Sequence, residues 1–157
     1  MSKGKKQAKD TFKEAVKNTP DVSNAYCPGL QALGGYSNKV VLQDPGRCEG
    51  SVDIDGTTVA IYPQDNRWDY CFSYKGETFF VEVHSADTGE VSTVIRKLQW
   101  LKDWLHNKAP RINAIKATSR HPFYWVQSNG FHILPNSAQY RRAIQNNIKP
   151  VARLALP

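Results

Sequence analysis

The chain has 157 residues, 40% of them hydrophobic, with four Trp, seven Tyr and six Phe, which is typical of one globular domain spanning residues 1–157. The sequence has no apolar run of about 20 residues and no hydrophobic segment behind its N-terminal lysines, so we expect neither a membrane span nor a secretory signal. Its three cysteines are widely spaced, which predicts no disulfide framework or zinc finger and favours the cytoplasm.

The net charge of +7 is distributed unevenly along the sequence. Residues 1–20 carry a balance of +4, residues 21–90 a balance of −7, and residues 91–157 a balance of +10. Lysine and arginine contact phosphates, whereas a metal ion needs oxygen ligands. An acidic middle between basic ends therefore fits a cation site within a surface that binds nucleic acid. A solvated basic face that maintains solubility is the alternative interpretation.

The first part of the chain is predicted to contain one helix and several short strands. Residues 1–9 are rich in lysine, and we expect them to form a flexible basic tail. A helix is predicted over residues 10–18, with Asp10 as its N-cap. One short strand is expected near residues 39–42, within a stretch rich in glycine and proline.

Residues 51–62 have the pattern of a β-hairpin. Two short strands, 51–54 and 57–62, flank Asp55-Gly56, which is a strong signal for a type I′ turn. Asp53 then lies on a strand in the acidic part of the chain, and we consider it a further candidate metal ligand.

A second predicted hairpin brings two carboxylates together. Residues 68–73 and 78–84 are rich in aromatic residues and valine, and they flank a turn around Lys75-Gly76. The predicted register places Asp69 opposite Glu82, whereas a one-residue slip would move Asp69 onto the apolar face. Two facing carboxylates, about 5 Å apart at Cβ, repel each other unless a proton or a divalent cation offsets their charge.

This arrangement resembles the core of the PD-(D/E)XK nuclease superfamily. Asp69 matches the Asp of the motif, with Asp65 as the fallback, Glu82 matches the Glu, and His84 occupies the position that is usually Lys. The resemblance extends over residues 10–130 in the predicted order helix, strand, Asp-bearing strand, Glu-X-His strand, helix and strand. It implies a restriction-endonuclease-like α/β fold, with a mixed central sheet flanked by helices.

The resemblance also implies a metal site and roles for its residues. Asp69 and Glu82, with the Val83 carbonyl, would hold Mg²⁺ or Mn²⁺, and Asp53 or Glu14 could complete the site. His84 would position or activate water. A solvated helix charge is the simpler interpretation of Glu14.

The rest of the sequence is predicted to contain two helices and three strands. One helix covers residues 90–106, capped by Asp87 or Thr88, and the other covers residues 137–148, with Tyr140, Ile144 and Ile148 on its inward face. A strand at residues 112–117 is reached by a right-handed parallel crossover. The other two strands, 123–128 and 131–134, form a hairpin that turns at Asn129-Gly130.

Six basic residues are candidates for contacting nucleic acid: Arg96, Lys97, Lys116, Arg120, Arg141 and Arg142. Arg96 and Lys97 lie off the apolar stripe of the helix that follows the Glu-X-His strand. Either side chain could therefore reach a scissile phosphate or replace the missing strand lysine.

The leading functional prediction is a metal-dependent nuclease that acts on nucleic acid, with DNA the expected substrate and a homodimer left open. One alternative keeps the fold without cleavage and binds single strands by stacking on Trp68, Trp100, Trp125 and Tyr124. The other is a metal-independent ribonuclease that uses His84, His121 and His132.

Overall fold

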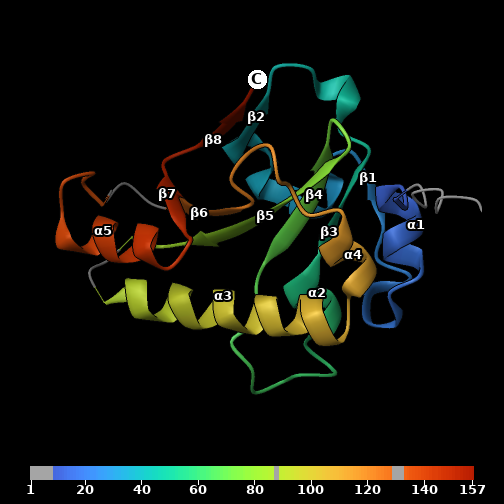
Figure 1. Ribbon diagram of the computed structural model, residues 1–157, viewed down its shortest axis with the longest axis horizontal. Coiled ribbons are helices and arrows are strands. Elements are labelled where there is room, and N and C mark those ends of the chain that lie inside the picture. Colours follow the sequence, from blue (N-terminus) through green and yellow to red (C-terminus); the bar gives the residue numbers. More distant parts are fainter. Residues whose placement is uncertain (1–8, 87–88, 129–132) are drawn as a thin grey trace, which may run out of the picture.

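The structure is a computed structural model that describes residues 9–86, 89–128 and 133–157. Its centre is a mixed six-stranded sheet in the order β1-β3-β4-β5-β6-β7 (Figure 1). These strands are β1 (Cys27–Pro28), β3 (Gly50–Asp53), β4 (Tyr70–Tyr74), β5 (Glu77–His84), β6 (Phe123–Gln127) and β7 (Lys149–Val151). The predicted α/β class with a mixed central sheet is confirmed.

Helices and a small second sheet complete the fold. The helices are α1 (Phe12–Lys17), α2 (Ile54–Thr58), α3 (Glu90–Asn107), α4 (Pro110–Ala114) and α5 (Ala138–Gln145), with short 3₁₀ segments at η1 (Pro20–Val22), η2 (Gln31–Lys39) and η3 (Pro45–Arg47). Strands β2 (Val40–Leu42) and β8 (Leu154–Leu156) pair in parallel as the second sheet. No helix in the described ranges combines the length and apolarity needed to cross a bilayer.

The β4–β5 hairpin adopts the predicted register. Cys71 pairs with Phe80 and Ser73 with Thr78. Lys75 and Gly76 have φ values of 50° and 80°, so both central turn residues occupy the left-handed region that a type I′ turn requires. This turn matches the right-handed twist of the strands and fixes the side-chain faces of both.

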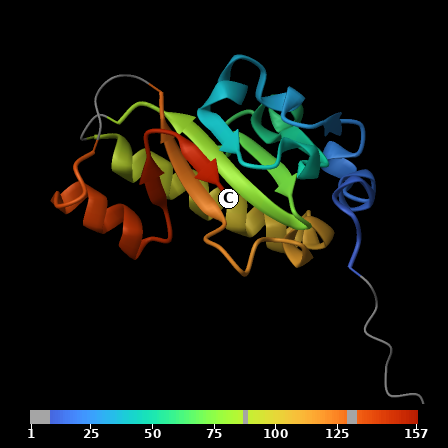
Figure 2. The ribbon, with the colours of Figure 1, turned by 90° about the horizontal axis from the view of Figure 1, so that it is seen from above.

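The hairpin is buried on both faces because the main sheet lies between two layers. Phe80 and Cys71 pack in one core with the apolar stripe of α3, while Phe72 and Phe79 pack in a second core with η2, β2 and β8. Figure 2 looks down on the sheet, with α3 behind it and β8 in front. Each core is formed by one set of alternating side chains along the strands.

The connection after β5 differs from the prediction. Helix α3 confirms the predicted helix, and the proposed caps Asp87 and Thr88 lie outside the described residues. The predicted strand at 112–117 is wrong, because Pro110 begins α4 and only one bridge, Thr78 to Lys116, joins this segment to the sheet. The strand parallel to β5 is β6.

The predicted hairpin at residues 51–62 is also wrong. Strand β3 ends at Asp53, whose carboxylate accepts a hydrogen bond of 2.8 Å from the Gly56 amide and caps α2. An aspartate can stabilise either a turn or a helix start, and here the buried Ile54 and Thr58 favour the helix.

Smaller differences occur near both ends. The N-cap of α1 is Thr11, which forms a capping box with Glu14, and not Asp10. Helix α5 ends at Gln145, so Ile148 is buried beyond the helix, whereas Ile144 is 43% exposed and does not face inward.

The second strand predicted for the hairpin after β6 is not found in the part that can be assessed. Residues 129–132 lie outside the described ranges, and 133–134 are not in a strand. Strand β6 itself is confirmed, and both of its neighbours, β5 and β7, run parallel to it.

Candidate active site

The hairpin brings Asp69 and Glu82 into direct contact through the backbone. Asp69 immediately precedes β4, and its amide donates a 3.0 Å hydrogen bond to Oε1 of Glu82. In return, the Val83 amide donates a 3.0 Å hydrogen bond to Oδ2 of Asp69. These reciprocal bonds hold the two carboxylates side by side, as the predicted register requires.

Lys97 adds a positive charge to this pair. Its Nζ lies 2.5 Å from Oε2 of Glu82, and only 17% of its side chain is exposed. Its neighbour Arg96 is exposed and donates to Thr93 at 3.3 Å. Of the two helix residues proposed to replace the strand lysine, Lys97 therefore reaches the acidic pair.

Burial sets the protonation behaviour of the three groups. Glu82 is fully buried, and burial, with a further contribution from Asp69, raises its pKa to about 8 although Lys97 opposes the shift. Burial likewise raises the pKa of Asp69. Burial alone would lower the pKa of Lys97, but the carboxylates of Glu82 and Asp69 raise it. Lys97 therefore stays charged, while Glu82 can change protonation near neutral pH.

His84 lies at the end of β5 between two carboxylates. Its Nε2 is 2.5 Å from Oε2 of Glu90 in the first turn of α3, and its Nδ1 is 3.7 Å from Oε2 of Glu82. Glu90 was not among the candidate residues predicted from the sequence. Its position at the start of the helix that follows the Glu-X-His strand was the available signal, because that turn must lie beside the strand end.

Two aspartates from the α2 region surround the pair without joining it. The carboxylate of Asp53 caps α2, and burial raises its pKa. Asp55 forms a 2.9 Å ion pair with Arg67. Both aspartates contribute to the raised pKa of Asp69, so the region is electrostatically negative.

Two other acidic candidates lie elsewhere. Glu14 closes the capping box of α1, and that helix start lines a surface recess together with Gly76, at the turn end of the hairpin. Glu14 is thus at the opposite end of the hairpin from Asp69. Asp65, the fallback for the Asp role, accepts a 3.0 Å hydrogen bond from the indole of Trp100.

The oxygen donors at the pair are suitable for a hard divalent cation. Phe80 and His84 direct backbone groups toward the β6 side, where they bond Pro122 and Ser128. Backbone groups of successive strand residues point to opposite sides, so Val83 directs both its carbonyl and its amide toward Asp69. No three Asp, Glu, His or Cys side chains of the described ranges gather as a metal cluster. An ion at this point would rely on Asp69, Glu82, the Val83 carbonyl and water.

The remaining basic candidates do not converge on the pair. The Nζ of Lys116 lies 5.8 Å from the ring centre of Phe123, and Arg120 packs over Tyr74 near the turn end of the hairpin. Arg141 and Arg142 are exposed on α5. The structure therefore assigns only Lys97 of the six to the site.

The alternative aromatic surface is largely buried. Trp68 and Trp125 are fully buried and Tyr124 is 5% exposed, so these three rings cannot stack with a nucleic-acid base. The predicted stacking role is wrong for these three residues because their rings pack in the hydrophobic cores. Trp100 is partly exposed and remains available.

The proposed histidine site is not assembled by the described residues. His84 pairs with Gln127 at the end of β6, whereas His121 precedes Phe123 at its start. Four residues of strand separate these positions by about 13 Å. His132 lies outside the described ranges.

Comparison with known proteins finds no match to this chain among family models, curated proteins or solved structures.

Proposed function

We propose that this protein is a metal-dependent nuclease that hydrolyses phosphodiester bonds in nucleic acid. The observation that carries the proposal is the buried Asp69–Glu82 pair with Lys97 at 2.5 Å from Glu82. Support also comes from α1, β3, β4, β5, α3 and β6, which occur in the order expected of a restriction-endonuclease-like core, with β1, β2, α2, α4 and short 3₁₀ segments between them.

The charge at the site favours a cation as the first ligand. Asp69 and Glu82 face a single lysine, and Asp53 adds a further negative charge nearby. A phosphate alone would be repelled, whereas Mg²⁺ or Mn²⁺ would bind the oxygens of Asp69, Glu82 and Val83. Such an ion would polarise a phosphoryl oxygen and lower the pKa of a bound water.

The protein groups have separate tasks in this proposal. Glu82 gives up its proton when it becomes a ligand. Lys97, charged and close to both carboxylates, donates a hydrogen bond to a non-bridging oxygen of the scissile phosphate. His84, held by Glu90, orients the Glu82 carboxylate.

The test is calorimetric titration of Mn²⁺ and Mg²⁺ into the wild type, Glu82→Gln and Glu77→Gln. Glu77 begins the same strand and bonds Thr118 and Ser119, so its variant is a matched control. We expect saturable binding that is lost in Glu82→Gln and kept in Glu77→Gln. Equal binding by all three proteins would contradict the metal site.

Cleavage is measured in parallel on single-stranded and duplex DNA and RNA. The proposal requires cleavage that depends on the added metal and is abolished by Glu82→Gln. Cleavage that persists in EDTA would instead support a metal-independent enzyme.

A non-catalytic nucleic-acid-binding protein on the same fold is the second candidate. One observation favours it: Nζ of Lys97 already lies 2.5 Å from Oε2 of Glu82, so it occupies a position at the oxygen that a metal ion would need. Nucleic-acid binding with neither metal uptake nor cleavage would identify this function.

A further inference from the structure

An aromatic recess lies beside the candidate active site on the same side of α3. Lys97, Trp100 and Trp104 recur at intervals of three and four residues, so they follow one side of the helix. Trp100 is one turn from Lys97, or about 4.5 Å along the helix axis. The recess at Trp100 therefore begins next to the lysine that contacts the acidic pair.

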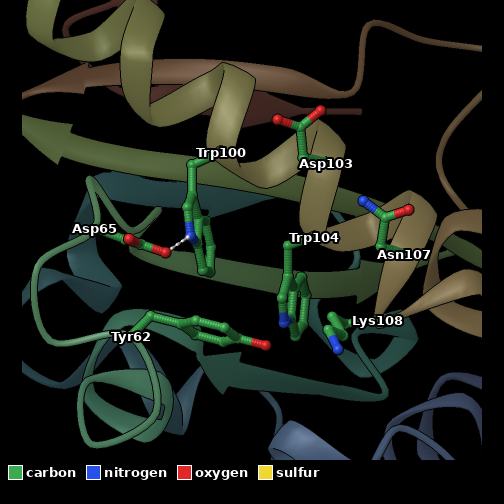
Figure 3. Close-up of a pocket in the computed structure, with 7 residues that line it drawn as sticks. All are labelled: Tyr62, Asp65, Trp100, Asp103, Trp104, Asn107 and Lys108. Carbon is green, nitrogen blue, oxygen red and sulfur yellow. Dashed lines mark hydrogen bonds between the residues drawn. The ribbon is translucent and has the colours of Figure 1, made fainter.

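The recess consists of two adjoining hollows that share Asp65, Trp100 and Asp103. One has a volume of about 260 Å³ and is also lined by Tyr62 and Trp104 (Figure 3). The other has a volume of about 360 Å³; the residues that complete its lining are Gln64, Asn66, Arg96 and Gln99.

The rings of the recess are held in place by hydrogen bonds. The planes of Trp100 and Trp104 are inclined by only 10°, with centroids 5.8 Å apart. Asp21 accepts hydrogen bonds from the Trp104 indole at 3.0 Å and from the Tyr62 hydroxyl at 2.6 Å, while Asp65 accepts one from the Trp100 indole at 3.0 Å. Because each polar ring atom is bonded, the ring of Trp100 is oriented before a ligand arrives.

The charges around the recess match a nucleotide better than a purely cationic or anionic ligand. The carboxylates of Asp65 and Asp103 can accept N–H groups from a base edge. Arg96 contributes a cation to one hollow and Lys108 to the other, and both can contact phosphates. These two cations would repel a basic peptide, and the two carboxylates would repel a purely anionic surface.

We propose that this recess binds an unpaired base next to the scissile phosphate, by stacking it on Trp100. The inference rests on the proposed function and narrows its substrate to single-stranded nucleic acid, or to a duplex with an unpaired base near the cut. A base within a continuous duplex has both faces covered by its neighbours and cannot stack on an indole.

The experiment compares binding of a fluorescein-labelled oligothymidine strand and of its duplex with oligoadenine, in EDTA. The proteins are the wild type, Trp100→Ala, Trp100→Phe and the control Tyr36→Ala, whose 43% exposed ring lies on η2 across the sheet. We expect Trp100→Ala to weaken single-strand binding about 5- to 150-fold. Duplex binding should change less than about twofold. Trp100→Phe should recover most of the loss.

Several outcomes would overturn the inference. One is unchanged single-strand affinity in Trp100→Ala, and another is an equal loss for single strand and duplex. A third is an arginine-rich peptide that binds at Trp100 and is not displaced by oligothymidine. If Trp100→Ala does not fold, the Trp100 indole N–H signal of the wild type decides: it must shift on titration with oligothymidine, and an unmoved signal rejects the subsite.

The failures of the two proposals remain distinguishable. Binding in EDTA requires no metal and no cleavage, so a Trp100-dependent preference for single strands without any cleavage would reject the nuclease and retain the subsite. Metal-dependent cleavage, with single-strand binding that is unchanged in Trp100→Ala, would reject the subsite and retain the nuclease.

Discussion

Nζ of Lys97 lies 2.5 Å from Oε2 of Glu82, and this contact connects α3 to the strand that carries the acidic pair. The strand itself has His84 where the resembled motif has lysine. A cation is nevertheless present beside the carboxylates, because the helix that packs on the strand supplies it.

Replacement of Lys97 should separate its proposed catalytic role from a general effect of positive charge. For Lys97→Met we expect the single-turnover cleavage rate to fall about 100- to 1,000-fold, because one donor to the transition state is lost. Lys102→Met is the control, since Lys102 lies on the same helix over Phe123. Full activity of Lys97→Met would remove Lys97 from the mechanism.

Metal affinity should depend on pH. The folded protein holds the pKa of Glu82 at about 8, so this group must lose a proton when it binds a cation. Between pH 6 and 8 we expect the association constant to rise up to about tenfold per pH unit, and to level off above pH 8. Calorimetry in two buffers of different ionisation enthalpy counts the released protons, and a count of zero would contradict the assignment.

The stability of the metal-free protein should respond to the same group. The pKa of Glu82 is raised from 4.5 to about 8 on folding, so its contribution to stability is complete below pH 4.5 and is lost as the pH rises through 8. Relative to Glu82→Gln, the wild type should therefore lose stability between pH 5 and 8.5, by at most about 4 kcal/mol. Urea unfolding at several pH values measures this difference, and parallel curves would show that Glu82 does not titrate here.

The contact between His84 and Glu90 should matter less than the acidic pair. We expect His84→Gln to reduce metal affinity or cleavage about 10- to 100-fold, since it orients a ligand without binding the ion. Glu90→Gln should give a smaller loss in the same direction. Complete loss of cleavage with unchanged metal affinity in His84→Gln would instead make this histidine a direct participant.

The sequence predicted the parts of the site that depend on local pattern. The apolar face of β4 and β5 allows one register, and that register brings Asp69 to Glu82. The choice between a turn and a helix start after β3 was harder to predict. Asp55-Gly56 predicted a turn, but Asp53 caps a helix at this point, and the burial of Ile54 and Thr58 favours that helix.

Contacts between distant segments could not be predicted from the pattern alone. Arg96 and Lys97 are neighbours with similar chemistry, and the rotation of α3 on the sheet determines which of them meets Glu82. Trp68 and Trp125 likewise carry no sequence mark that distinguishes them from Trp100. Their burial follows from the packing of the whole sheet against α3.

The pairing of β2 with β8 has a consequence for the order in which the molecule can be completed. Residues 40–42 pair with residues 154–156, which lie far along the chain. During synthesis on the ribosome, the core that contains Phe72 and Phe79 is covered only after β8 has been made. Closing such a long loop is slow, so we infer that this layer forms late and is where a nascent chain is most exposed to aggregation and chaperones.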